Sequence, residues 1–196
     1  MRYTRYIILI ILFALLQTAC THNSRPIPKP TAYLRLTYPP HSYQWIDNPE
    51  LPIRFQIADS ATLVVKRCTA RESWLDITYP QYDGIIFLTY KSINSQQDLR
   101  KQMDDSYEML KTHFGIAAGI DETTLINNAS HVYATAYKLS GKNVASTYQF
   151  TATDSTHHFL HGSFYLNRTP NNDSLAPLLS YIQTDIDHLL ETLQWK

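Results

Sequence analysis

Two stretches with helical periodicity divide the rest of the sequence into segments in which apolar and polar residues alternate. The first stretch is expected to form a helix that begins at Ser95 and ends at Gly115. Five apolar residues lie on one face of this helix at steps of three or four: Leu99, Met103, Tyr107, Leu110 and Phe114. In the second, residues 175–193 carry a continuous apolar stripe, with a cap at Asp173 or Ser174 and Pro177 in the first turn. Each helix is therefore expected to bury one face in a core.

The segments around these helices have the pattern of short strands. We expect strands at residues 33–38, 53–57, 63–66, 74–79, 85–90, 132–139, 144–151 and 159–166. The run 85–90 is apolar on both faces, which indicates a strand covered on both sides. Residues 116–130 are expected to form a loop or a short helical turn. Turns at 140–142 and 154–156 make the last three strands an antiparallel meander.

The order strands, helix, strands, helix predicts the fold class. It indicates an α+β domain in which two long helices pack on a largely antiparallel sheet. This order is similar to that of the PsbP/Mog1 sandwich. The sequence shows no internal repeat and no second domain.

The N-terminal residues have the pattern of a secretory signal. The apolar run 6–16 would form a helix about 16 Å long, too short for the roughly 30 Å of bilayer hydrocarbon. Thr18-Ala19 directly before Cys20 resembles the lipobox of bacterial lipoprotein precursors, although that box usually has leucine where Gln17 stands. We expect cleavage of residues 1–19 and lipid attachment at Cys20. The alternative is an ordinary secreted protein with an incidental cysteine at the cleavage site.

Residues 20–31 are expected to form a tether between this lipid and a single domain over residues 32–196. Three prolines in the tether favour an extended spacer of about 3 Å per residue. No acidic run follows Cys20, whereas acidic stretches at that place resemble signals for export to the cell surface. We therefore favour the cell envelope, with the domain on the periplasmic face of the outer membrane.

Charge and cysteine content argue against nucleic-acid binding and against an internal disulfide. Of the 17 Lys and Arg residues, Arg2 and Arg5 belong to the leader, which leaves 15 against 17 Asp and Glu. No basic patch stands out, so nucleic acid is not an expected partner. With Cys20 acylated, Cys68 is the only thiol, so an internal disulfide is excluded. We interpret Cys68 as a small buried side chain, with a reactive thiol as the alternative.

Two groups of polar side chains could carry chemistry. In a strand, His157 and His161 stand about 13 Å apart on one face and His158 points the other way, so exposed strand histidines are a better interpretation than a zinc site. The second group is interpreted as a solvated helix face, with cation chelation as the alternative: Asp185, Asp187, His188 and Glu191.

The sequence carries no motif that identifies an enzyme. It lacks a nucleophile elbow, a glycine-rich phosphate loop and paired cysteines at zinc spacing. We expect no catalytic residue, no metal and no cofactor. Three tripeptides that begin at Asp59, Asp154 and Asp173 resemble O-glycosylation sequences of exported bacterial proteins, but turn or cap chemistry is the preferred interpretation.

Several segments resemble the gliding motility lipoprotein GldD family. In the first half these are residues 28–30, 33–35, 74–80 and 87–91. The C-terminal third is more distinctive and contains Thr153-Asp154-Ser155-Thr156-His157-His158-Phe159-Leu160, Gly162, Tyr165-Leu166-Asn167-Arg168-Thr169-Pro170-Asn171, Asp173-Ser174-Leu175-Ala176-Pro177 and Glu191-Thr192-Leu193-Gln194-Trp195-Lys196. The resemblance covers nearly all of the chain after Cys20.

This resemblance implies a lipoprotein needed for gliding motility and linked to type IX protein secretion. It transfers no catalytic residue. We therefore expect a non-enzymatic accessory or assembly factor that is anchored to the membrane through Cys20 and binds protein partners in the cell envelope. The alternative is a periplasmic ligand-binding or hydrolytic domain with a pocket lined by some of the 14 tyrosines.

Overall fold

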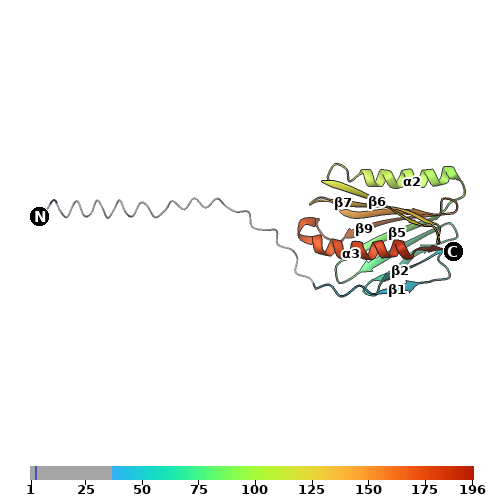
Figure 1. The fold of residues 1–196 in the computed structure, drawn as a ribbon, viewed down its shortest axis with the longest axis horizontal. Coiled ribbons are helices and arrows are strands. Elements are labelled where there is room, and N and C mark those ends of the chain that lie inside the picture. The colour runs from blue at the N-terminus through green and yellow to red at the C-terminus, as the bar shows by residue number, and fades with distance from the viewer. Residues whose placement is uncertain (1–2, 4–36) are drawn as a thin grey trace. The chain divides into compact units, whose positions relative to one another are not determined.

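The computed structural model describes Tyr3 and residues 37–196. The expected leader, Cys20, the tether and residues 33–36 of the first expected strand lie outside these residues. Thr37 and Tyr38, which end that expected strand, are not in a strand. Residues 37–196 fold as predicted into an α+β unit with antiparallel sheets and two helices (Figure 1).

In chain order, the elements are β1 (Tyr43–Ile46), β2 (Ile53–Ala58), β3 (Thr62–Cys68), β4 (Glu72–Tyr79), β5 (Gly84–Ser92), α2 (Gln96–Lys111), β6 (Gly119–Asn127), β7 (Val132–Ser140), β8 (Ser146–Thr153), β9 (His158–Leu166), α3 (Asn172–Thr192) and β10 (Gln194–Trp195).

The larger sheet has seven antiparallel strands in the order β3-β4-β5-β9-β8-β7-β6. The expected meander of β7, β8 and β9 is confirmed. At its centre, Gly162 pairs with Leu88 on one side and with Phe150 on the other. A Cβ atom at Gly162 would lie 2.2 Å from Cζ of Phe150, so the absence of a side chain lets this ring lie across β9.

The two helices lie on opposite faces of this sheet, as successive residues of β9 show. Leu160 belongs to the core cluster that α3 completes, whereas His161 lies beside Ser106 of α2. Strand side chains alternate between faces, so neighbours in the chain contact different helices. The smaller sheet, β1-β2-β10, adds Ile53 and Phe55 of β2 to the α3 side of the core.

The two helices differ from their expected bounds and faces. The apolar stripe of α3 is confirmed, but its N-cap is Asn171, so Pro177 lies beyond the first turn. Helix α2 is capped by Ser95 as predicted and ends at Lys111, before Gly115. Its predicted apolar face is confirmed at Leu99 and Leu110, which are buried with Gln102 and Ser106. It is wrong at Met103 and Tyr107, which are 44% and 49% exposed, and at exposed Phe114.

Three strands and the environment of a fourth differ from the predictions. The segment expected to be a loop contains β6, which pairs with β7 over its whole length. As an edge strand, β6 is largely exposed, and its sequence therefore lacks a clear apolar alternation. The short strands β1 and β10 were not predicted. In β5, Phe87 is 41% exposed because α2 covers β8 and β9, so β5 is not fully covered on both sides.

Candidate binding site beside β10

A tight turn between β8 and β9 forms one wall of the largest cavity. Ser155 occupies the centre of this turn with φ at 69°, a left-handed backbone conformation that residues other than glycine rarely adopt. Asp154 stabilises it, because its Oδ1 accepts the backbone N–H groups of Thr156, His157 and His158 at 2.8–2.9 Å. The expected turn chemistry of this Asp-Ser-Thr tripeptide is therefore confirmed.

These hydrogen bonds keep the Asp154 carboxylate charged. Burial favours the neutral form and raises the pKa, but the three backbone N–H groups and the Thr156 hydroxyl, 2.7 Å from Oδ2, outweigh burial and lower the pKa to about 2. A carboxylate with so low a pKa is a weak base. The hydroxyl proton of Thr156 also points to Asp154, so the arrangement does not activate Thr156 as a nucleophile.

His158 links this turn to the C-terminal strand. Its ring stacks on the indole of Trp195, with centroids 5.1 Å apart and planes 6° from parallel. Its Nδ1 lies 2.8 Å from the hydroxyl of Tyr90 in β5. Burial raises the pKa of Tyr90 to about 12, so this hydroxyl keeps its proton; which of the two atoms donates depends on the tautomer of His158. Burial also lowers the pKa of His158, which favours the neutral ring.

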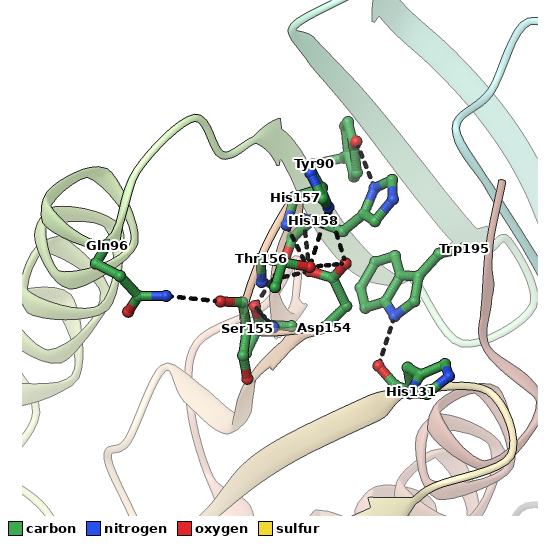
Figure 2. Close-up of polar contacts among 10 residues, drawn as sticks. Tyr90, Gln96, His131, Asp154, Ser155, Thr156, His157, His158 and Trp195 are labelled. Atoms are coloured by element: carbon green, nitrogen blue, oxygen red, sulfur yellow. Dashed lines mark hydrogen bonds and ion pairs between the residues drawn. The ribbon is translucent and has the colours of Figure 1, made fainter.

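The turn between β6 and β7 closes the other side of the site. His131 adopts a left-handed conformation, φ 51°, and its carbonyl oxygen accepts a hydrogen bond of 3.0 Å from Nε1 of Trp195. Figure 2 shows this contact and the hydrogen bonds that the Asp154 carboxylate accepts. It also shows Gln96 of α2, whose side chain donates to the carbonyl of Ser155 at 3.0 Å. Two turns that are distant in the sequence therefore meet at Trp195.

The cavity is open to solvent and has a volume of about 760 Å³. Its walls come from the two turns and from β10: Ala129, Ser130, His131, Asp154, Thr156, His158, Gln194, Trp195 and Lys196. Most of its polar groups already have partners inside the domain. The Lys196 ammonium, for example, lies 2.7 Å from Asp47 Oδ1. The cavity therefore offers a shaped, nearly neutral surface.

The three predicted histidines do not converge. His157 is exposed in the turn, His158 faces Trp195, and His161 lies under α2 on the opposite face of the sheet. The expected placement of His158 and His161 on different faces is confirmed, but the expectation that they are exposed is wrong, since both are half-buried. Within residues 37–196, no group of three or more His, Cys, Asp or Glu side chains could hold a metal ion.

The interpretation of the acidic group on α3 as a solvated face is wrong for three of its members. Asp185 is 2% exposed and accepts hydrogen bonds from His41 Nδ1 at 2.7 Å and from the Tyr79 hydroxyl at 3.2 Å. Half-buried Asp187 pairs with Tyr148 and with Lys138. His188 stacks on Tyr43 with centroids 3.6 Å apart; Glu191 is exposed, as expected. The group therefore holds the domain together and does not gather around a cation.

Tyrosines do not line the largest cavity. Several of them pack instead around the segment 37–43 and α3, where Tyr38 stacks on Tyr181 with centroids 5.0 Å apart and contacts Tyr82. Two tyrosines, Tyr107 and Tyr137, line a cleft of about 170 Å³ under α2, and Tyr79 alone lines another cavity of about 440 Å³. Among these cavities, the one lined by more than one tyrosine is therefore a small cleft under α2.

The structure tests the prediction for Cys68 but not the prediction for Cys20. Cys68 is half-buried, not fully buried, and its thiol donates to the carbonyl oxygen of Glu50 at 3.1 Å. Lipid attachment at Cys20 stays a prediction, because Cys20 lies outside the described residues. Among the described residues, no helix is long and apolar enough to cross a bilayer.

Sequence reasoning did not single out Trp195, Gln194 or His131 as site residues. These residue types recur in many loops, and only the fold brings them together. One signal was available, because the segments 153–160 and 191–196, which resemble the GldD family, supply six of the nine residues that line the cavity.

Comparison with known proteins gives three findings. No curated protein matches the sequence. The fold is similar to the solution structure of cyanobacterial PsbP (CyanoP) from Synechocystis sp. PCC 6803, with a TM-score of 0.45 and 14% identity over 80% of this chain and 94% of that one. At such values the similarity says nothing about function. The family model of the gliding motility lipoprotein GldD matches residues 23–195, and the chain therefore belongs to the gliding motility lipoprotein GldD family.

Proposed function

We propose that this protein is a non-enzymatic accessory or assembly factor for gliding motility and type IX protein secretion, which binds an envelope protein at the cavity beside β10. Membership of the GldD family supports the link to gliding motility. In this proposal, a lipid on Cys20 holds the domain at the periplasmic face of the outer membrane. The cavity then serves as the contact surface for the partner.

The state of the polar groups in the cavity carries this proposal: five of the eight polar side chains that line it have a partner within the domain, and those of Ser130, His131 and Gln194 have none among the described residues. Asp154 is held by backbone N–H groups, the His158 Nδ1 is bonded to Tyr90, and the Trp195 indole N–H is bonded to His131. A reaction site needs a nucleophile, acid or base that is free to act on substrate. Groups that are already bonded provide shape and rigidity, which a binding surface needs.

The alternative function, a small-ligand or hydrolytic site, has less support. The tyrosine-lined cleft under α2 holds about 170 Å³, below the roughly 300 Å³ at which ligand pockets begin. The cavity beside β10 has sufficient volume. Its Thr156 hydroxyl, however, donates to the Asp154 carboxylate, whose pKa is low, so Thr156 is not activated as a nucleophile.

The test is a pull-down of the native lipoprotein from detergent-solubilised membranes with matched substitutions. Ala129 is exposed and lines the cavity, so Ala129→Arg places a bulky charge there without removing a hydrogen bond of the domain. Ala145 is exposed in the β7–β8 connection and does not line this cavity, so Ala145→Arg is the matched control. Cys20→Ser serves as the untethered control.

We expect wild type and Ala145→Arg to enrich type IX secretion or gliding components, and Ala129→Arg to reduce this enrichment by about fivefold or more, as a central interface clash does. Strains that carry Ala129→Arg should also secrete and glide less. Recovery of the lipoprotein alone from wild-type membranes would contradict the proposal and favour a small ligand. Full enrichment with Ala129→Arg would show that the partner binds elsewhere.

A further inference from the structure

Strand β10 has one free edge. It pairs with β2 only, at the end of the order β1-β2-β10. The Lys196 N–H donates to the carbonyl of Pro52 at 2.9 Å. Since antiparallel residues alternate between bonded and non-bonded pairs, Gln194 also faces β2, and the N–H and C=O of Trp195 point away from it. No partner for these two groups is found among residues 37–196.

This free edge lies at the cavity. Gln194, Trp195 and Lys196 all line it, with the turn 129–131 and the turn 154–158 as the other walls. Figure 2 shows Trp195 between His131 and His158. A volume of about 760 Å³ accommodates several residues of extended chain, which advance about 3.3 Å each. An unpaired strand edge beside an open cavity is the arrangement to which extended peptides add as a further strand.

We propose that an extended segment of a protein partner pairs with the backbone of Trp195 and continues the β1-β2-β10 sheet as an added strand. This inference rests on the proposed function and specifies how the partner binds. The parallel rings of Trp195 and His158 give a flat wall for one side chain of the peptide, such as a proline or an aromatic residue.

The charges of the site favour a peptide whose central residues are uncharged. The oxygens of Asp154 are occupied by the turn, and the ammonium of Lys196 is paired with Asp47. Recognition therefore depends on main-chain hydrogen bonds and on one packed side chain. A strongly acidic or basic segment would find no free counter-charge among the lining residues.

The contacts of the segment 37–43 argue against the protein's own tether as the occupant. Tyr38 stacks on Tyr181 of α3. Because α3 rises about 1.5 Å per residue, the 11 residues from Tyr181 to the end of the helix at Thr192 place Tyr38 roughly 16 Å from the start of β10.

The test uses the mature lipidated protein in detergent, with a displayed library of random linear peptides long enough to cross the cavity as the probe. A selected peptide is N-methylated one residue at a time, and its affinity is measured by fluorescence anisotropy. The exchange rate of the Trp195 amide is measured by NMR with and without this peptide. Ala129→Arg and Ala145→Arg are compared as before.

If the inference is correct, N-methylation weakens binding by roughly three- to tenfold at the one peptide residue whose N–H meets the Trp195 carbonyl, and not at its two neighbours, whose N–H groups point away from β10. The peptide also slows exchange of the Trp195 amide, and Ala129→Arg loses the peptide while Ala145→Arg keeps it.

Three results would overturn the inference. The first is a bound peptide that leaves Trp195 exchange unchanged or shows no such difference between neighbouring residues on N-methylation. The second is a Trp195 amide already protected in the free protein and exposed on deletion of residues 21–36, which would assign the edge to the tether. The third is failure of all linear peptides to bind. If Ala129→Arg still loses the envelope partners in the pull-down, the proposed function stands and only the added strand is excluded.

Discussion

Asp185 lies on the face of α3 that is turned to the core. It stands three residues after Ile182 and four before Leu189, and both of these are buried. Its carboxylate is satisfied by His41 and Tyr79, which come from distant parts of the chain. Asp185 was predicted to lie on a solvated face, although its spacing from Ile182 and Leu189 is that of the apolar stripe. Its partners could not be predicted, because nothing local relates residue 41 or 79 to residue 185.

We predict that Asp185→Ala destabilises the domain by about 3 kcal/mol, since it leaves a buried tyrosine hydroxyl and a histidine N–H without an acceptor. Urea denaturation followed by circular dichroism measures this change. Asp105→Ala on the exposed face of α2 is the control and should change the unfolding free energy by less than about 0.5 kcal/mol. A loss below about 1 kcal/mol for Asp185→Ala would show that the cluster contributes little.

At the scale of elements, the sequence predicted the strands that alternate clearly and lie inside the sheet. β2, β4, β5, β7 and β9 were placed within one or two residues of their observed ends. The edge strand β6 was missed because exposed positions carry no apolar pattern, and two-residue β10 is too short to have one. The free edge at Trp195 therefore could not be predicted before the pairing of β10 with β2 was known.

The buried face of helix α2 was predicted correctly at its two ends and wrongly in its middle, and the reason lies in the sheet beneath it. Leu99 packs with Ile93 and Phe159 at one end, and Leu110 packs with Leu139 and Val144 at the other. Between these two apolar contacts, Gln102 and Ser106 of the helix lie over a polar part of the sheet. Periodicity shows that a helix has an apolar stripe, but not whether the surface beneath it is apolar.

His161 lies in this polar layer, where burial and the nearby Lys91 lower its pKa to about 4. The unfolded chain takes up this proton near pH 6.5, so the stabilisation from a neutral His161 is complete above about pH 6.5 and is lost as the pH falls towards 4. Between pH 7 and pH 5 we expect wild type to lose about 2 kcal/mol more unfolding free energy than His161→Gln.

Urea denaturation at the two pH values measures this difference. His157→Gln is the control, because His157 is exposed in the turn and should leave the wild-type dependence on pH unchanged. Hydrogen exchange adds a local readout, in which the amides of α2 should lose protection at pH 5 in wild type and keep it in His161→Gln. An identical dependence on pH in wild type and His161→Gln would contradict the prediction.

At the scale of the whole molecule, family membership and the expected lipid anchor describe one arrangement, a folded domain that follows a tether. The sequence predicted the family, the fold class and the long apolar face of α3, because these depend on patterns within continuous segments. It did not predict the cavity, whose walls come from two turns and a terminal strand. Such a site arises only when the sheets are assembled.

At this scale we predict that Cys20 carries the lipid that anchors the protein to the membrane. We expect the wild-type protein and Cys68→Ser to sediment with membranes and to incorporate labelled palmitate, and Cys20→Ser to do neither. Cys68 is the matched control because its thiol already bonds to the carbonyl of Glu50 within the domain. Membrane fractionation and autoradiography measure both properties, and a labelled Cys20→Ser protein would assign the lipid to another residue.

The contacts of residues 38–43 with α3 have a mechanical consequence. Tyr38 packs on Tyr181, His41 on Asp185 and Tyr43 on His188, so the chain lies beside the helix and advances with it, one turn of α3 for each contact. Tension that reaches the domain through a membrane tether would meet Tyr38 first, then His41, and only then the start of β1. The segment would therefore detach in steps and absorb a pull before the sheet and its free edge are disturbed.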